Sequence, residues 1–247
     1  MLAGGAVTGS AALAAPSPYW QSPDGLVTVY HSRWEHVHAA GLLPVREVAL
    51  VHADPPYGID VATDRSKSKG GKKFPKIVGD KAPFDPSGLV ALGRPSVLWG
   101  ANNYAARLPD SYAWFVWDKL GTMEPFDGSD AEMAWTNIGA SVRLFRHMWR
   151  GVARDSELST IGLHPTQKPI ALSSYVFQRA KLRPGDLVFV PYLGSGPDLP
   201  AAVAMGLRVI ACDVERWCCD TAIGRLGAIT AEKAAEPVGP LFGGAHP

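Results

Sequence analysis

The chain has 247 residues, of which 47% are hydrophobic and 19% are charged, and these values fit one α/β domain with a large core. The formal net charge of +1 neither requires nor excludes a nucleic-acid partner, because local patches of charge matter more than the total. No apolar run approaches the roughly 20 residues that span a bilayer, so no membrane partner is expected.

The three cysteines lie close together, at Cys212, Cys218 and Cys219. This spacing resembles neither a disulfide framework nor a metal site, so we expect a reducing, cytoplasmic setting and no metal. The stretch 1–24 is small and apolar but has no Lys or Arg before its apolar part, which a secretion signal needs. We predict a loosely packed or disordered arm over 1–24, one folded domain over 25–230, and a flexible tail over 231–247.

Hydrophobic periodicity predicts alternating strands and helices along the chain. Strands are expected at 25–33, 47–53, 96–100, 112–119, 186–196 and 208–215, and helices at 34–43, 101–109, 169–182, 197–206 and 216–227. The last third therefore forms a βαβ unit. Residues 60–86 are rich in Lys, Gly and Ser and predict a mobile basic loop, and residues 120–163 predict an irregular segment with scattered aromatic and arginine residues.

A glycine turn joins a strand to a helix in the last third of the chain. Gly194-Ser195-Gly196 would let the backbone approach a ligand closely, and Asp213 ends the next strand, where an acid suits the two hydroxyls of a ribose. The third glycine of a dinucleotide fingerprint and the Lys of a P-loop are both lacking, which favours a nucleoside without a pyrophosphate. The alternative is a plain strand–helix turn.

The stretch HPTQKP, residues 164–169, directly precedes a predicted helix. Thr166 or Gln167 could cap that helix, but Lys168 would place a cation at its start, which is electrostatically disfavoured. A carboxylate ligand nearby would remove this conflict. The alternative is a solvated turn.

The stretch DPPY, residues 54–57, follows a buried strand at the end where open α/β sheets bind ligands. Its prolines stiffen the exit from the strand and remove N–H donors. The groups left to contact a ligand are the carbonyls of Asp54 and Pro55, the Asp54 carboxylate and the flat Tyr57 ring. Such a set of acceptors suits a planar group that bears an NH2, such as a nucleobase. The alternatives are a turn or cap role for Asp54 and a core role for Tyr57.

Together, residues 25–228 resemble the S-adenosylmethionine-dependent DNA amino-methyltransferases, which modify the exocyclic amine of adenine or cytosine. DPPY matches the catalytic motif of this family, HPTQKP the segment before the cofactor strand, Gly194-Ser195-Gly196 the cofactor loop, and Asp213 the ribose acid. The stretch AIGRL, residues 222–226, also occupies a family position. The catalytic motif precedes the cofactor motif, which corresponds to the beta arrangement of the family.

The resemblance implies a doubly wound, mostly parallel, seven-stranded Rossmann-like sheet with one reversed edge strand. It implies methyl transfer from S-adenosylmethionine to a flipped adenine of duplex DNA, in a restriction-modification setting, with a possible homodimer. The catalytic residues would be Asp54, Pro55, Pro56 and Tyr57. The cofactor-binding residues would be His164, Thr166, Lys168, Pro191, Tyr192, Gly194, Ser195, Gly196 and Asp213.

Two basic regions are candidates for DNA contacts. The basic loop offers Lys67, Lys69, Lys72 and Lys73, which could lie along the phosphate backbone, although a solvated surface loop is the alternative. The segment 120–163 lies where target recognition is expected, and Arg146 and Arg150, spaced four apart, could share a helix face.

The cofactor half departs from the family pattern. Val190-Pro191-Tyr192 replaces the usual Asp-Pro-Phe, whose acid lies near the methionine end of the cofactor, and Pro197-Asp198 replaces Thr-Thr. Asp198 is a candidate for the missing charge. Three interpretations of this departure stay open: weaker cofactor binding, an altered cofactor, and a cofactor-impaired homologue that binds nucleic acid. For the substrate, the alternatives are cytosine and RNA.

Overall fold

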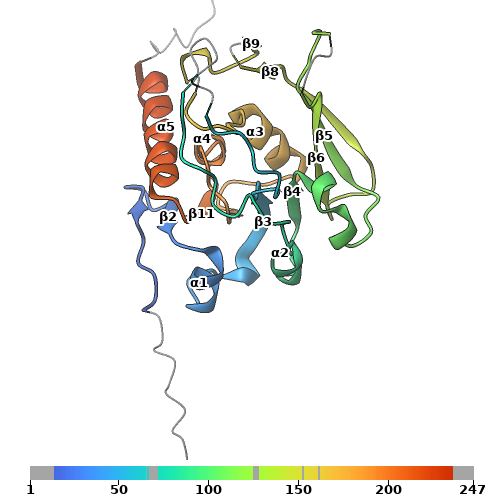
Figure 1. The fold of residues 1–247 in the computed structure, drawn as a ribbon. Coiled ribbons are helices and arrows are strands. Elements are labelled where there is room, and N and C mark those ends of the chain that lie inside the picture. The colour runs from blue at the N-terminus through green and yellow to red at the C-terminus, as the bar shows by residue number, and fades with distance from the viewer. Residues whose placement is uncertain are drawn as a thin grey trace, which may run out of the picture.

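The computed structural model describes residues 14–235, except residues 65, 67–71, 125–127, 152 and 161. Within these residues a nine-stranded sheet has the order β1-β2-β11-β10-β3-β4-β6-β5-β7 (Figure 1). Its strands are β1 (Trp20–Gln21), β2 (Val27–His31), β3 (Val48–Ala53), β4 (Ser96–Trp99), β5 (Trp114–Asp118), β6 (Ala131–Thr136), β7 (Arg143–Arg146), β10 (Leu187–Val190) and β11 (Arg208–Asp213). A separate antiparallel pair consists of β8 (Trp149–Arg150) and β9 (Ala153–Arg154).

Helices cover both faces of the sheet, as Figure 1 shows. They are α1 (Trp34–Ala39), α2 (Ser87–Ala91), α3 (Ile170–Arg179), α4 (Asp198–Ala204) and α5 (Arg216–Ala235), with 3-10 turns at Val45–Glu47, Ala101–Asn103, Ala105–Arg107 and Leu158–Thr160. No helix in the described parts of the chain is long and apolar enough to span a membrane.

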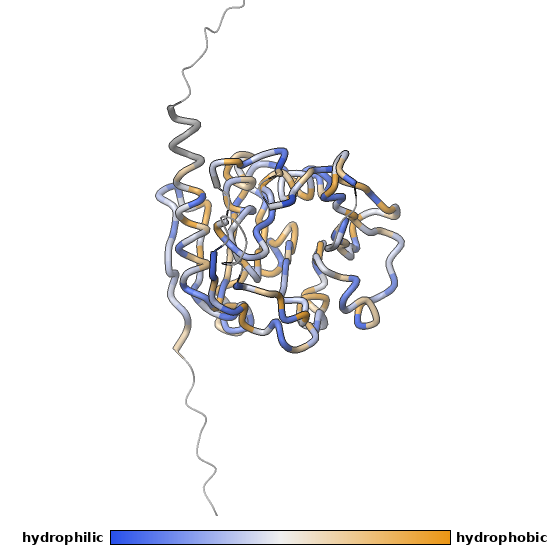
Figure 2. The backbone as a smooth tube through the Cα atoms, turned by 45° about the horizontal axis from the view of Figure 1, so that its top comes forward, coloured by the Kyte–Doolittle hydropathy of each residue, from blue (hydrophilic) through white to orange (hydrophobic). Residues whose placement is uncertain are grey.

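Each face of the sheet has its own hydrophobic core. Helices α3, α4 and α5 pack on one face through residues such as Leu172, Leu199 and Ala222, and α1 and α2 pack on the other through Trp34 and Leu89. A strand buried on both faces needs apolar residues at successive positions, which explains the continuous run in β3. The coloured part of helix α5 contains both hydrophobic and hydrophilic residues (Figure 2), and it packs on the core through Cys219, Ala222 and Leu226.

The doubly wound, mostly parallel fold is confirmed, but the described sheet has nine strands where seven were expected. Short strands β1 and β7 extend the sheet at its two edges. The expectation that the reversed strand lies at an edge of the sheet is also corrected. Strand β6 runs antiparallel to both of its neighbours and lies between β4 and β5. Strand β1, at one edge, is antiparallel to β2. In the chain β5 comes before β6, but in the sheet β6 lies next to β4, between β4 and β5.

Four local predictions differ from the structure. The segment expected to be irregular, 120–163, contains β6 to β9, and β6 was overlooked because AEMAWT has no β-branched run before Thr136. The helix expected at 101–109 is two 3-10 turns. Strand β1 lies inside the expected arm, where Trp20 pairs with Val29, and α5 continues to Ala235, past the expected start of the tail.

Candidate functional site

A cavity of about 1110 Å³ opens where β3, β4, β10 and β11 end. Parallel strands bring their carboxyl ends to the same edge of a sheet, so stretches far apart in the sequence meet there. All four residues of DPPY line the cavity, as do five residues of HPTQKP, from His164 to Lys168, and Gly194, Ser195 and Asp213. The three predicted motifs thus share one site.

The DPPY carboxylate is held by a lysine from HPTQKP. Lys168 Nζ lies 2.5 Å from Asp54 Oδ2 and 3.2 Å from Glu132 Oε2, and Lys119 Nζ lies 3.2 Å from Glu132 Oε1. Two carboxylates and two ammonium groups form this cluster, so its formal charges balance. Its members come from the exit of β3, from β5–β6 and from the segment before α3, and only the folded sheet brings them together.

The charges in this cluster stabilise one another. Burial disfavours the Lys168 ammonium, but the facing Asp54 and Glu132 carboxylates raise the pKa of Lys168, so that it stays protonated. Burial likewise disfavours the Glu132 carboxylate, but Lys168 and Lys119 lower the pKa of Glu132. Lys168 is 8% exposed at its side chain, so it acts as a fixed charge rather than as a solvated one.

Tyr57 orients the Asp54 carboxylate. Its hydroxyl donates to Asp54 Oδ1 at 2.5 Å and accepts from Lys168 Nζ at 3.1 Å. Burial, followed by the Asp54 charge, raises the pKa of Tyr57 well above its ordinary value, so the phenol remains a donor. The ring packs against Gly100, which has φ +69°, and a Cβ there would lie 2.0 Å from the nearest ring carbon. Gly100 is therefore required where Tyr57 packs.

The two ends of the segment that follows DPPY are tied to each other near Gly58 and Asp80, and the mobility expected for the loop 60–86 stays a prediction. The buried Asp80 carboxylate accepts hydrogen bonds from the amides of Gly58, Ile59 and Val61 at 2.7–3.3 Å. A buried carboxylate with several N–H donors fixes the backbone around it. The sequence reasoning gave Asp80 no role, although an acid flanked by Gly79 in a lysine-rich stretch was a usable signal.

The predicted DNA-contacting lysines are only partly placed. Lys67 and Lys69 lie outside the described residues. Lys72 is exposed and lines the cavity, and Lys73 is exposed with its Nζ 3.8 Å from Asp64 Oδ2. Of these two lysines, only Lys72 borders the cavity, and the DNA contacts of both stay a prediction.

The two arginines predicted to share a helix face do not, because neither lies on a helix. Arg146 ends β7, and its Nε lies 3.6 Å from Asp118 Oδ2, while Arg150 belongs to β8. Neither lines the cavity. Arg154 of β9, which received no role, does line it and stacks 4.0 Å from the Trp149 ring.

Asp213 holds the glycine turn in place. Its Oδ2 accepts from the amide of Gly194 and its Oδ1 from that of Glu215, both at 2.8 Å. Each oxygen keeps a further lone pair for a ligand hydroxyl. Gly194 and Ser195 line the cavity, but Gly196 packs against α5, where a Cβ would lie 2.3 Å from that of Ala222.

A buried arginine ties the turn to the rest of the site. Arg225 Nη1 donates to the carbonyl and hydroxyl oxygens of Ser195 at 3.2 and 3.1 Å, and its Nη2 donates to the Lys168 carbonyl and to Glu157. The Ser195 side chain is therefore engaged by Arg225. This gives the arginine of AIGRL a definite structural role.

His164 and Thr166 form one wall of the cavity. His164 stacks on Trp217 with ring centroids 5.0 Å apart, and its Nδ1 accepts from the Thr166 amide at 3.2 Å. Burial and the nearby Lys168 charge lower the pKa of His164 to about 4, so the ring is neutral at pH 7. The Trp217 indole nitrogen is buried and has no hydrogen-bond partner among the described residues.

The structure places the residues at which the sequence departs from the methyltransferase motifs. Val190 is 1% exposed and belongs to the core. Pro191 and Tyr192 line the cavity, and the Tyr192 hydroxyl accepts from the Trp34 indole at 3.2 Å. Asp198 also lines the cavity and is buried against His52, whose Nδ1 lies 2.5 Å from Asp198 Oδ1.

Sequence reasoning missed several of these residues. Glu132 lies inside the segment 120–163 that was interpreted as irregular, Lys119 ends the strand expected before it, and His52 was counted only as part of a strand. Nothing in the sequence pairs these residues with Asp54, because they approach it only across the sheet.

Comparison with solved structures supports the fold assignment. The complex of M1.HpyAVI with SAM matches with a TM-score of 0.51 and 18% identity, over 81% of this chain and 98% of that chain. PvuII DNA methyltransferase, which is cytosine-N4-specific, matches with a TM-score of 0.56 and 13% identity, over 85% and 89%. The chain has a methyltransferase fold. No family model matches the sequence.

Proposed function

We propose that the chain is a DNA amino-methyltransferase that uses S-adenosylmethionine and acts on the exocyclic amine of a base. The observation that carries the proposal is that Asp54 and Asp213 line one cavity from the ends of parallel strands β3 and β11, with β10 between them. A nucleoside held at one end would face an amine held at the other.

The residues present fit this cofactor. Asp213 and the glycine turn offer hydroxyl acceptors and close backbone approach, and the cavity is large enough for a nucleoside and a base together. The aromatic wall of His164 and Trp217 offers stacking surface beside Asp213. S-adenosylmethionine supplies an electrophilic methyl group when bound.

The DPPY residues would prepare the amine. The lone pair of an exocyclic amine is delocalised into the base, so the nitrogen is a poor nucleophile. Acceptance of its two N–H groups by the Asp54 carboxylate and the Pro55 carbonyl favours a pyramidal nitrogen, and the base stacks on Tyr57. Catalysis then comes chiefly from positioning and fixed electrostatics, and Asp54 is the carboxylate placed to take the proton that the nitrogen releases.

Adenine is the proposed target base, because Asp rather than Ser precedes Pro-Pro-Tyr. Cytosine is the alternative, and the cytosine-N4-specific PvuII enzyme shares the fold. A flipped base in duplex DNA, a homodimer, a restriction-modification setting and a cytoplasmic location belong to the same proposal.

The test is incubation with methyl-labelled S-adenosylmethionine and unmethylated duplex DNA, followed by digestion to nucleosides. We expect label in methyladenine, and at least a hundredfold less with Asp54→Ala. Label in methylcytosine would move the proposal to the alternative base. Label in a parallel incubation with RNA, with none in DNA, would move it to an RNA substrate. No label in any of them, beside an active control enzyme, would end it.

A cofactor-impaired nucleic-acid-binding homologue is the second candidate. Burial of Val190 in the core supports it, because no carboxylate stands at that position. Calorimetry of the wild-type protein with S-adenosylmethionine separates the two candidates. Saturable binding near micromolar excludes the impaired homologue.

A further inference from the structure

Two side chains near the ends of β3 and β4 and one from the first turn of α4 form a buried chain of hydrogen bonds on the cavity wall. The Trp99 indole donates to His52 Nε2 at 2.8 Å, and His52 Nδ1 lies 2.5 Å from Asp198 Oδ1. Trp99 is fully buried, and His52 and Asp198 are each 5% exposed. All three line the cavity.

This geometry fixes the state of the histidine. An indole N–H can only donate, so His52 Nε2 must accept and cannot carry a proton. The ring is therefore neutral, its single proton lies on Nδ1, and that proton is donated to Asp198. His52 offers Asp198 one hydrogen bond but no positive charge.

Asp198 is consequently a carboxylate without a cationic partner among the described residues. Its second oxygen receives no hydrogen bond within that part of the chain. A buried carboxylate with one neutral donor is costly unless a further charge or donor reaches it. The cavity is the route by which a ligand cation would do so.

The location of Asp198 suits one particular part of the proposed cofactor. Asp198 follows β10, which lies between β11, carrying Asp213, and β3, carrying Asp54. A nucleoside seated at Asp213 with its reactive sulfur toward Asp54 therefore passes the end of β10. The amino-acid arm on that sulfur carries the ammonium group of the cofactor.

We propose that Asp198, held by His52 and Trp99, binds the α-ammonium of the methionine arm. The proposal rests on the proposed function. It explains how a chain with valine at the end of β10 keeps a negative charge beside the cofactor: the carboxylate comes from the helix that follows the glycine turn instead of from the strand before it.

The test varies the protein and the ligand together, by calorimetry. The ligands are S-adenosylhomocysteine and its deaminated analogue, 5′-S-(3-carboxypropyl)-5′-thioadenosine. A hydrogen bond to a charged group corresponds to about a 10- to 100-fold change in affinity, so the wild-type protein should bind the deaminated analogue that much more weakly. Asp198→Asn, which still accepts from His52, should bind the two ligands within about threefold of each other.

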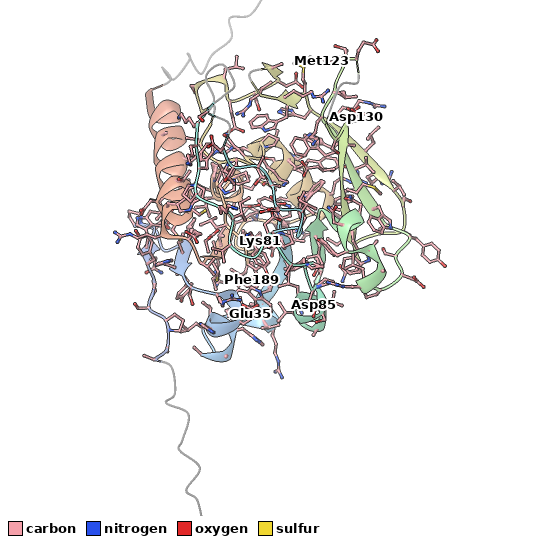
Figure 3. The ribbon with its side chains drawn as sticks, in the orientation of Figure 1. Glu35, Lys81, Asp85, Met123, Asp130 and Phe189 are labelled. Atoms are coloured by element: carbon pink, nitrogen blue, oxygen red, sulfur yellow. The ribbon has the colours of Figure 1, made fainter. Side chains whose placement is uncertain are left out.

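Asp85→Asn is the matched control, because Asp85 also lines the cavity but is exposed, just before α2 (Figure 3). It should keep the wild-type preference. Asp198→Thr tests the same point if the asparagine variant does not fold, because its hydroxyl also accepts from His52.

Each result decides the inference. A wild-type protein without the preference, or an Asp198 variant that retains it, overturns the role of Asp198 while leaving the cofactor in place. A wild-type protein that binds S-adenosylmethionine, S-adenosylhomocysteine and the analogue with no measurable affinity overturns the proposed cofactor as well, so the two failures are distinguishable.

Discussion

Lys168 Nζ lies 2.5 Å from Asp54 Oδ2, although the two residues are 114 positions apart in the chain. The pairing resolves the electrostatic conflict of a cation just before a helix, because the carboxylates that balance Lys168 belong to the protein itself. HPTQKP therefore supports the DPPY carboxylate directly. The role predicted for Lys168 in binding the cofactor stays a prediction.

Replacement of Lys168 by Met should destabilise the protein by about 3 kcal/mol, because it leaves two partly buried carboxylates without their shared cation. Urea unfolding measures the effect. Lys81→Met, at an exposed position, should change stability by less than about 0.5 kcal/mol. A Lys168→Met/Glu132→Gln double variant should recover part of the loss, and no recovery would contradict the charge argument.

Gly100→Ala should abolish methyl transfer, because the added methyl group would occupy the space of the Tyr57 ring. Gly93→Ala is the matched control. Gly93 has φ +63°, close to that of Gly100, but nothing lies within 4 Å of its added Cβ. Both variants place an alanine in the left-handed region, at a cost of about 1–2 kcal/mol of stability. Because unfolding curves measure this shared cost, a difference in activity between the two variants reports on the contact with the Tyr57 ring. Equal activity in the two variants would contradict the role of Tyr57.

Protonation of His164 should favour unfolding. Its pKa is lowered to about 4 in the folded protein by burial and by Lys168, against about 6.5 in the unfolded chain. The unfolded state therefore binds one more proton between these values, and the free energy of unfolding falls as the pH falls from about 6.5 toward 4. Since the ring is partly exposed, the slope is at most about 1.4 kcal/mol per pH unit.

His164→Gln should remove this contribution to the pH slope, although it also loses the stack on Trp217. Loss of the stack shifts the whole stability curve without changing its slope. Urea unfolding at several pH values between 4.5 and 7 measures both effects. Parallel curves for the two proteins would show that His164 titrates normally in the folded state.

The Lys72→Gln/Lys73→Gln double variant should weaken DNA binding and lower the dependence of log K on log salt by about 1 to 2. Both lysines are exposed, and Lys72 lines the cavity. Binding is measured by fluorescence anisotropy across a salt series. Lys181→Gln is the control, because Lys181 follows the distal end of α3, and its salt slope should equal that of the wild type. An unchanged slope in the double variant would remove these lysines from the DNA surface.

Local patterns predicted most of the fold. Continuous apolar runs identified β3, β4, β10 and β11, because burial on both faces of a parallel sheet leaves few other patterns. Gly100 and Gly194 marked the turns after β4 and β10. Strand β6 escaped prediction. Its pairing with β4 and β5 stabilises a stretch whose own propensity is weak, so its neighbours decide its structure.

By itself, the sequence determined that an acid, two prolines and an aromatic ring end one strand and that a glycine turn and an acid end two others. These features are local, since each depends on residues within one turn. Only the tertiary structure decided that Lys168 faces Asp54 and that His52 faces Asp198. Ion pairs and hydrogen bonds between distant segments depend on sheet order and register, which no single stretch of the chain encodes.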